Sequence, residues 1–118
     1  MFKNVDPAQA AIAFDLRHVR AGSGLSFQTA LAVMGKHVRS IFVKDARWSN
    51  ERTTNIKNVP LDTGIVNKQI FDDVRNDHST MPLSLHMEWG KAPIYPKQVV
   101  MEAVANIKKD VKVLKSWL

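Results

Sequence analysis

Cysteine is absent from this sequence. A disulfide scaffold, a thiolate metal site and a cysteine nucleophile are therefore excluded. Also missing is any apolar run near the roughly 20 residues that a membrane-spanning helix needs. The N-terminal stretch MFKNVDPAQAA lacks the apolar core of a secretory signal. We therefore expect a protein that is made in the cytoplasm and has no membrane partner.

Acidic residues are the minority among the charged side chains. The 11 Asp and Glu residues face 17 Lys and Arg residues, which gives a net charge of +6. This excess permits contact with nucleic acid or with an acidic protein surface. The only local cluster, KKDVKVLK at 108–115, favours a solvated helix face over a specific phosphate site. The length of 118 residues predicts one domain, 1–118, with an ordinary core.

Two helices are predicted near the N-terminus. Asp6 and Pro7 suit a helix start, so we expect a short helix at about 6–21. Ser26 suits the cap of a second, longer helix at about 26–45. Apolar residues of the second helix recur at steps of four and three, as one buried stripe requires: Phe27, Leu31, Met34, Val38 and Ile41.

The rest of the chain predicts a loop, strands and a final helix. Polar residues dominate 46–64, which predicts a long loop of the kind that often carries function. Strands are expected at about 70–74 and 82–89, and a helix at about 96–116. The final helix has an apolar stripe to bury: Val100, Val104, Ile107, Val111, Leu114 and Leu118.

These elements predict an α+β fold with a long N-terminal helix. Its sheet is expected to be small and mainly antiparallel, with the C-terminal helix packed on the sheet.

The tripeptide Asp62-Thr63-Gly64 is typical of aspartic protease active sites. Such a protease is almost all β, and its two aspartates share a proton across a symmetric dimer. The predicted helices before and after the tripeptide argue against that fold. We interpret the tripeptide as a structural turn, in which Asp62 accepts backbone N–H groups and Gly64 supplies an unusual conformation.

The sequence gives little evidence for any other catalytic or metal site. The histidines are scattered, and those on predicted helices lack a second metal ligand three or four residues away. His86 and Glu88 are two residues apart on one predicted strand face, a spacing that suits a metal, but an exposed polar face is the favoured interpretation. We therefore predict that the protein is not an enzyme and holds neither a metal nor a cofactor.

Two motifs in the second half of the chain resemble one known family. The first is RWSNERTTNIKNVPLDTGIVNKQI, in which Pro-Leu-Asp-Thr-Gly precedes Gln69 and Ile70. The second is Met-Glu-Trp-Gly at 87–90, followed by a loop with prolines and the final helix. Their order, over residues 26–118, resembles that of the tail-completion and head–tail joining proteins of tailed bacteriophages. Five positions depart from the family pattern: Trp89 replaces Phe, Lys91 replaces Thr, and Ile94-Tyr95-Pro96 replaces Arg-Pro-Phe.

The resemblance implies a structural virion subunit without catalysis or cofactor. Such a subunit forms a homo-oligomeric ring at the head–tail neck or the tail end and contacts neighbouring neck or tail proteins. Its location would be the virion, after assembly in the host cytoplasm. Basic residues that face the ring lumen would suit non-specific contact with passing DNA.

The predicted loop at 46–64 is the candidate interface. Trp48 is its best aromatic anchor, with Arg47, Arg52 and Lys57 around it. The alternative function is a basic helix-turn-helix-like DNA-binding module made by the first two helices. Against it, the second predicted helix is long and apolar from Phe27 onward, whereas recognition helices are usually short and polar at their start.

Overall fold

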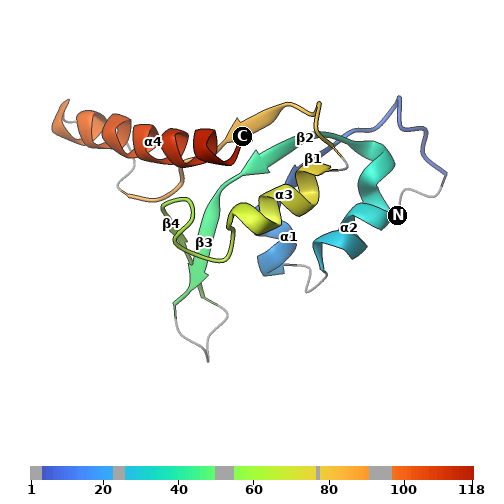
Figure 1. The fold of residues 1–118 in the computed structure, drawn as a ribbon, viewed down its shortest axis with the longest axis horizontal. Coiled ribbons are helices and arrows are strands. Elements are labelled where there is room, and N and C mark those ends of the chain that lie inside the picture. Colours follow the sequence, from blue (N-terminus) through green and yellow to red (C-terminus); the bar gives the residue numbers. More distant parts are fainter. Residues whose placement is uncertain (1–3, 23–25, 50–54, 77, 91–96) are drawn as a thin grey trace.

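The structure is a computed structural model that describes residues 4–22, 26–49, 55–76, 78–90 and 97–118. The described ranges mix helices with small sheets, which confirms the broad α+β prediction (Figure 1). The elements in chain order are β1 (Ile12–Asp15), α1 (Leu16–Gly22), α2 (Phe27–Met34), the 3₁₀ turn η1 (Gly35–His37), β2 (Val38–Val43), β3 (Asp45–Trp48), β4 (Ile56–Val59), α3 (Lys68–Asn76), β5 (Leu83–Leu85) and α4 (Lys97–Trp117).

The main sheet has three strands in the order β1-β2-β5, and both neighbouring pairs are parallel. Parallel neighbours need long crossover connections. The segment with α1 and α2 connects β1 to β2, and the segment with β3, β4 and α3 connects β2 to β5. The prediction of a mainly antiparallel sheet is therefore wrong, because among the described residues only the two-stranded β3–β4 sheet is antiparallel.

The core lies where α1, α2 and α3 pack on one side of this sheet (Figure 1). From the central strand β2, the fully buried side chains are Val38, Ile41 and Val43, and Phe14 of β1 lies beside them. Helices α2 and α3 also contact each other. This arrangement leaves β3–β4 and α4 outside the helix-covered sheet.

The predicted helix at 6–21 is wrong over its first half. Asp6 does accept a hydrogen bond from the Ala8 N–H at 2.8 Å, but the turn does not continue. The chain enters β1 instead, because pairing with β2 buries Phe14. Helix α1 starts only at Leu16, where the Asp15 carboxylate accepts the His18 N–H at 2.9 Å.

The predicted long helix at 26–45 ends early. Ser26 caps α2 as expected, through its hydroxyl oxygen and the Thr29 N–H, but α2 ends at Met34. The following residues form η1 and then β2. Val38 and Ile41 fit the helical spacing, yet β-branched residues also suit a central strand, and the partners β1 and β5 decide the outcome.

The predicted strand at 70–74 is wrong, since these residues lie in α3. The Asn67 side chain caps this helix by accepting the Ile70 N–H at 3.1 Å. Lys68 and Asp72 form an ion pair one turn apart, and such pairs support a short helix.

Two further predictions need correction. The residues predicted as a loop at 46–64 include most of the β3–β4 hairpin, because Asp45–Trp48 pairs with Ile56–Val59. The strand predicted at 82–89 is confined to Leu83–Leu85, where three residues pair with β2.

The predicted C-terminal helix is confirmed as α4. Its main packing partner is α3 rather than a sheet, and the Phe71 and Trp117 rings lie 5.4 Å apart between centroids. Within the described ranges, no helix has the length and apolar character needed to cross a membrane.

Candidate protein interaction surfaces

The turn at Asp62-Thr63-Gly64 is organised by Asp45, the first residue of β3. The buried Asp45 carboxylate accepts four backbone N–H groups. Its Oδ1 accepts from Ala46 at 2.7 Å and Val66 at 2.9 Å, and its Oδ2 accepts from Thr63 at 3.0 Å and Gly64 at 2.7 Å. Burial raises the pKa of the Asp45 carboxyl, and the four N–H donors act in the opposite direction.

The roles expected for Asp62 and Gly64 are therefore corrected. Asp62 is exposed and holds the positive backbone φ of 67°, while the accepting carboxylate is Asp45. Gly64 is needed for a different reason from the one predicted. A Cβ at this position would collide with the Ala46 carbonyl and lie 2.6 Å from Asp45 Oδ1.

A second buried carboxylate, Asp110 of α4, holds the other side of this segment. Its Oδ1 accepts the Leu61 N–H at 3.0 Å, and its Oδ2 accepts the Trp89 Nε1–H at 2.6 Å. Only 3% of Asp110 is exposed. Because these bonds point Asp110 toward the body, they set the rotation of α4 about its own axis.

That rotation leaves the predicted apolar stripe of α4 largely uncovered. Three of its residues, Val100, Val104 and Ile107, are between 42% and 47% exposed, and Met101, which lies beside them but was not in the predicted stripe, is 63% exposed. The face that is buried contains Ala103, Asn106, Asp110, Leu114 and Trp117. The prediction that the stripe is core is therefore wrong for Val100, Val104, Ile107 and Leu118, whereas Val111 is half-buried and Leu114 is buried. We call Val100, Met101, Val104 and Ile107 the α4 stripe.

The β3–β4 hairpin brings together three of the four predicted interface residues. Trp48 pairs with Ile56, and Arg47 pairs with Lys57. Trp48 is 42% exposed, and Arg47 and Lys57 are exposed as well. Like charges directly opposite each other in a sheet are unfavourable, so this basic pair suits an anionic partner. The fourth predicted residue, Arg52, lies outside the described residues.

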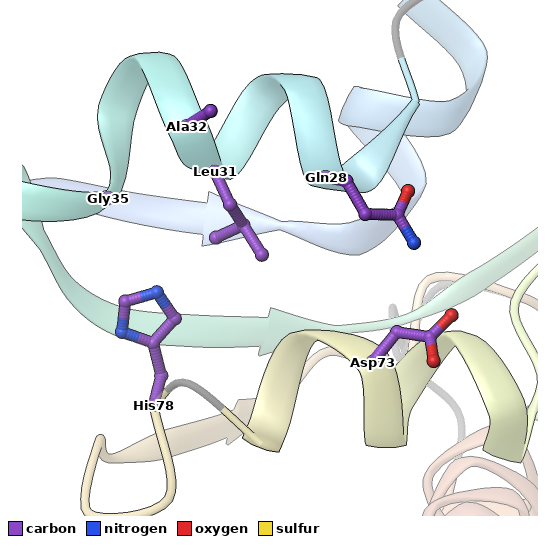
Figure 2. A pocket seen from close by; sticks show the side chains of 6 residues that line it. All are labelled: Gln28, Leu31, Ala32, Gly35, Asp73 and His78. Atoms are coloured by element: carbon purple, nitrogen blue, oxygen red, sulfur yellow. The ribbon is translucent and has the colours of Figure 1, made fainter.

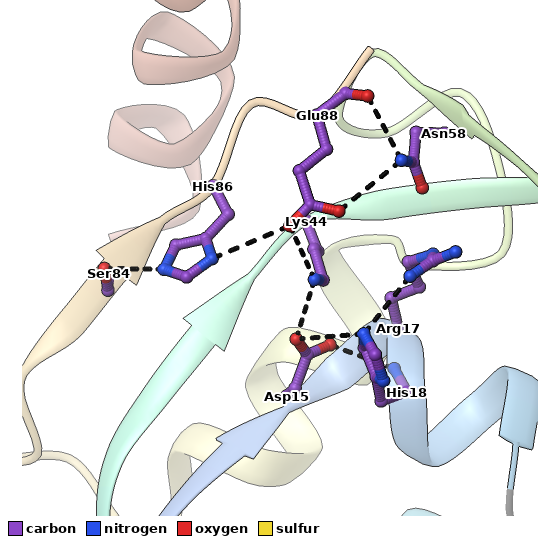
Figure 3. A network of polar contacts seen from close by, with 8 residues as sticks. All are labelled: Asp15, Arg17, His18, Lys44, Asn58, Ser84, His86 and Glu88. Carbon is purple, nitrogen blue, oxygen red and sulfur yellow. Dashed lines mark hydrogen bonds and ion pairs between the residues drawn. The ribbon is translucent and has the colours of Figure 1, made fainter.

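A polar network joins the carboxyl ends of the three parallel strands (Figure 3). The Lys44 Nζ, on a side chain only 7% exposed, lies 3.1 Å from Asp15 Oδ2 and 2.8 Å from Glu88 Oε1. The hydrogen bond from Lys44 lowers the pKa of Glu88. Asp15 ends β1, Lys44 follows β2 and Glu88 comes after β5, so the network ties the strand ends together.

His86 also belongs to this network. Its Nδ1 lies 3.9 Å from Glu88 Oε1, and its Nε2 lies 3.0 Å from the Ser84 hydroxyl (Figure 3). Its ring also stands 4.3 Å from that of Phe42, measured between centroids. In the part of the chain that the structure describes, no three His, Cys, Asp or Glu residues are grouped so as to hold a metal ion.

Periodicity alone missed the exposed stripe of α4, because two apolar stripes share this helix. The second contains Val99, Ala103, Val113 and Trp117, and its signal is weaker because polar Asn106 and Asp110 interrupt it. Comparison with known proteins found no family model, curated protein or solved structure that matches this chain. The surfaces described above are therefore the basis for assigning a function, together with the motifs of the sequence.

Proposed function

We propose that this protein is a structural subunit of a tailed-phage virion. In this proposal it forms a homo-oligomeric ring at the head–tail neck or the tail end, and it joins or completes the tail. The observation that carries the assembly role is the α4 stripe, which faces solvent while polar Asn106 and Asp110 face the body. The phage assignment rests on the two sequence motifs.

The α4 stripe favours association for a simple energetic reason. Burial of apolar surface is favourable by about 25 cal/mol per Å². Large apolar side chains gathered on one exposed surface commonly mark interaction sites. The stripe residues lie at steps of one, three and three along one helix, so a single partner surface can cover them together.

The β3–β4 hairpin supplies a second contact surface. Trp48 offers a large apolar area, and Arg47 and Lys57 offer positive charge beside it. Aromatic and arginine side chains are frequent anchors of protein interfaces. The same charges suit sequence-independent contact with DNA that passes through a ring.

The proposed function is tested by the mass and shape of the purified protein, alone and with virion components. We expect a closed ring of several copies by native mass spectrometry and negative-stain imaging. Val104→Glu should abolish the ring, since it places a charge in the α4 stripe. Ser116→Glu is the matched control, because Ser116 is exposed on the same helix but lies more than two turns beyond Ile107.

Two outcomes would contradict the proposal. One is an assembled neck or tail that contains a single isolated copy of this chain. The other is tight, base-selective binding to a short duplex, which would favour the helix-turn-helix alternative. The burial of Phe27, at the start of α2, argues against this alternative, because α2 would be its recognition helix.

A further inference from the structure

A groove lies between α2 and α3 on the helix-covered side of the sheet (Figure 2). Its volume is about 340 Å³. Figure 2 shows Leu31 pointing from α2 toward the space above α3, with Gln28 and Asp73 facing each other at one end and His78 at the other. The described residues that line it are Gln28, Leu31, Ala32, Gly35, Asp73 and His78. The groove thus combines an apolar α2 wall with a carboxylate on α3.

Asp73 has acceptor capacity left over for a cation. Its Oδ1 accepts a hydrogen bond from Gln69 Nε2 at 2.9 Å. Its Oδ2 has no hydrogen-bond partner among the residues that the structure describes. A lysine brought to this wall of the groove would complete the coordination of the carboxylate.

The α4 stripe has the complementary character. On a helix with 3.6 residues per turn, Lys108 lies on the same face as the stripe, one turn beyond Val104, and Lys115 lies on that face about two turns further along. Both lysines are exposed. A surface that covers the stripe therefore needs an apolar centre with negative charge on one side.

Pairing of two α4 helices with each other does not meet this need. In an antiparallel pair related by a two-fold axis, the same flank of each helix meets its copy. Centred on the stripe, such a pair brings Lys108 of one chain close to Lys97 of the other, because the two lysines lie on that flank at opposite ends of the stripe. Like charges across an interface are unfavourable. The groove, in contrast, offers Asp73 to that flank.

The stripe and the groove lie toward opposite ends of the molecule. Figure 1 shows α4 at one end of the longest axis and α2 near the other, and the extents are 49 × 35 × 26 Å. One copy can therefore use both surfaces at once. Repeated contacts between two different surfaces form a ring when the rotation between copies closes.

We propose that the α4 stripe of one copy docks into the α2–α3 groove of the next copy, with Lys108 beside Asp73. This inference rests on the proposed assembly function and names the two surfaces that meet. Each interface is then head-to-tail, and every copy supplies one helix and one groove.

A mixing experiment with full-length chains tests this arrangement. Val104→Glu disables the stripe, and Ala32→Glu disables the groove; both positions are exposed helical residues, so folding should survive. Neither variant alone should form a species larger than a monomer. An equimolar mixture should give a one-to-one heterodimer that grows no further, because only one intact stripe and one intact groove remain. Native mass spectrometry with one isotope-labelled variant identifies this species, and circular dichroism checks folding.

A charge exchange tests the Lys108–Asp73 contact. Asp73→Lys and Lys108→Asp should each weaken association by about tenfold or more. The double variant should recover most of this loss, since the pair is restored with the charges exchanged. Lys109→Asp is the matched control, because Lys109 lies farther around the helix from the stripe.

Three results would overturn the docking arrangement while leaving the assembly function in place. The first is that Ala32→Glu assembles like the wild type. The second is that the wild type assembles, but the mixture of Val104→Glu and Ala32→Glu forms no heterodimer. The third is that the variant with both charge changes shows no recovery of association. A wild type that stays monomeric both alone and with virion components overturns the docking arrangement and the proposed function together.

Discussion

At the scale of single residues, Asp45 shows how one carboxylate shapes a distant segment. Three of its four N–H donors lie 18 to 21 residues further along the chain. Such donors are costly to leave unpaired in a buried place. Asp45 therefore determines the shape of the turn that follows β4, and the exposed Asp62 does not.

We predict that Asp45→Asn destabilises the protein by about 2–6 kcal/mol. An amide has one acceptor oxygen in place of two, so about two donors lose their partner, at about 1–3 kcal/mol each. Urea unfolding monitored by circular dichroism gives the free energy. The matched control is Asp62→Asn, the same change at an exposed carboxylate, for which we expect less than about 0.5 kcal/mol. Equal losses for the two variants would contradict the role of Asp45.

The turn itself yields a second prediction. Asp62→Ala should cost about 1 kcal/mol, because Asp62 has positive φ and alanine tolerates that region less well than Asp or Asn. Asp62→Gly should cost nothing or stabilise the protein. Gly64→Val should be the most damaging, by about 3 kcal/mol or more, since its Cβ meets the Ala46 carbonyl. Thermal unfolding of the variants gives the order.

The same variants test the protease interpretation of the tripeptide. A structural turn predicts no peptide hydrolysis by any of them. Hydrolysis by the wild type that Asp62→Asn abolishes, with folding intact, would show that the carboxylate serves chemistry.

At the scale of elements, the network around Lys44 connects three strand ends and makes their stability depend on pH. Lys44 lowers the pKa of Glu88 below its ordinary value of 4.5. A carboxyl whose folded pKa is depressed contributes stability above about pH 4.5, and this contribution is lost as the pH falls through the folded pKa. Burial of Asp45 acts with the opposite sign, because a raised folded pKa makes stability fall as pH rises through it.

We therefore predict that Glu88→Gln changes how the free energy of unfolding depends on pH in the acidic range. The difference in unfolding free energy between wild type and Glu88→Gln should shrink as the pH falls from 6 to 3. Asp45 is present in both proteins, so the comparison isolates Glu88. Because the Glu88 side chain is 40% exposed, high salt should reduce the difference. A difference that stays constant over this pH range would contradict the prediction.

Helix α4 shows that the position of an element and its orientation have different causes. Its position follows from a long run of helix-compatible residues between Pro96 and the end of the chain. Its orientation follows from Asp110, whose carboxylate is bonded to Leu61 and Trp89. For this reason Val100, Met101, Val104 and Ile107 face outward, whereas Leu114 and Trp117 are buried.

At the scale of the whole molecule, the projecting hairpin and helix concentrate positive charge outside the core. Helix α4 contains five lysines against Glu102 and the buried Asp110. Arg47 and Lys57 add to this charge on the hairpin. Such a distribution favours weak attraction to polyanions without selection of sequence.

We predict salt-sensitive DNA binding that does not depend on base sequence. Arg47→Ala combined with Lys57→Ala should weaken binding equally for duplexes of different sequence and should reduce the salt dependence. Fluorescence anisotropy at several salt concentrations measures both effects. Arg75→Ala is a poor control because its guanidinium donates to the Met81 carbonyl, so Lys36→Ala serves instead. Retention of the full salt dependence by the double variant would exclude the hairpin as the DNA contact.

The sequence by itself determined the features that depend on near neighbours. Ser26 caps α2 with a donor three residues away, and a helix fills the C-terminal end, both as predicted. Asn67 and the Lys68–Asp72 pair are equally local signals for α3, although the residues at 70–74 also fit a strand pattern. Such contacts span one helical turn, so they are present in any fold that keeps the segment helical.

Tertiary structure alone decided three other features. Val38 and Ile41 lie in a strand because β1 and β5 flank this segment. The Asp62-Thr63-Gly64 turn forms around Asp45, and Asp110 orients the α4 stripe toward solvent. In each case the decisive partner lies far away in the chain. A distant partner leaves no periodic trace near the residue that it acts on, and burial of an unpaired polar group costs more free energy than local preference supplies.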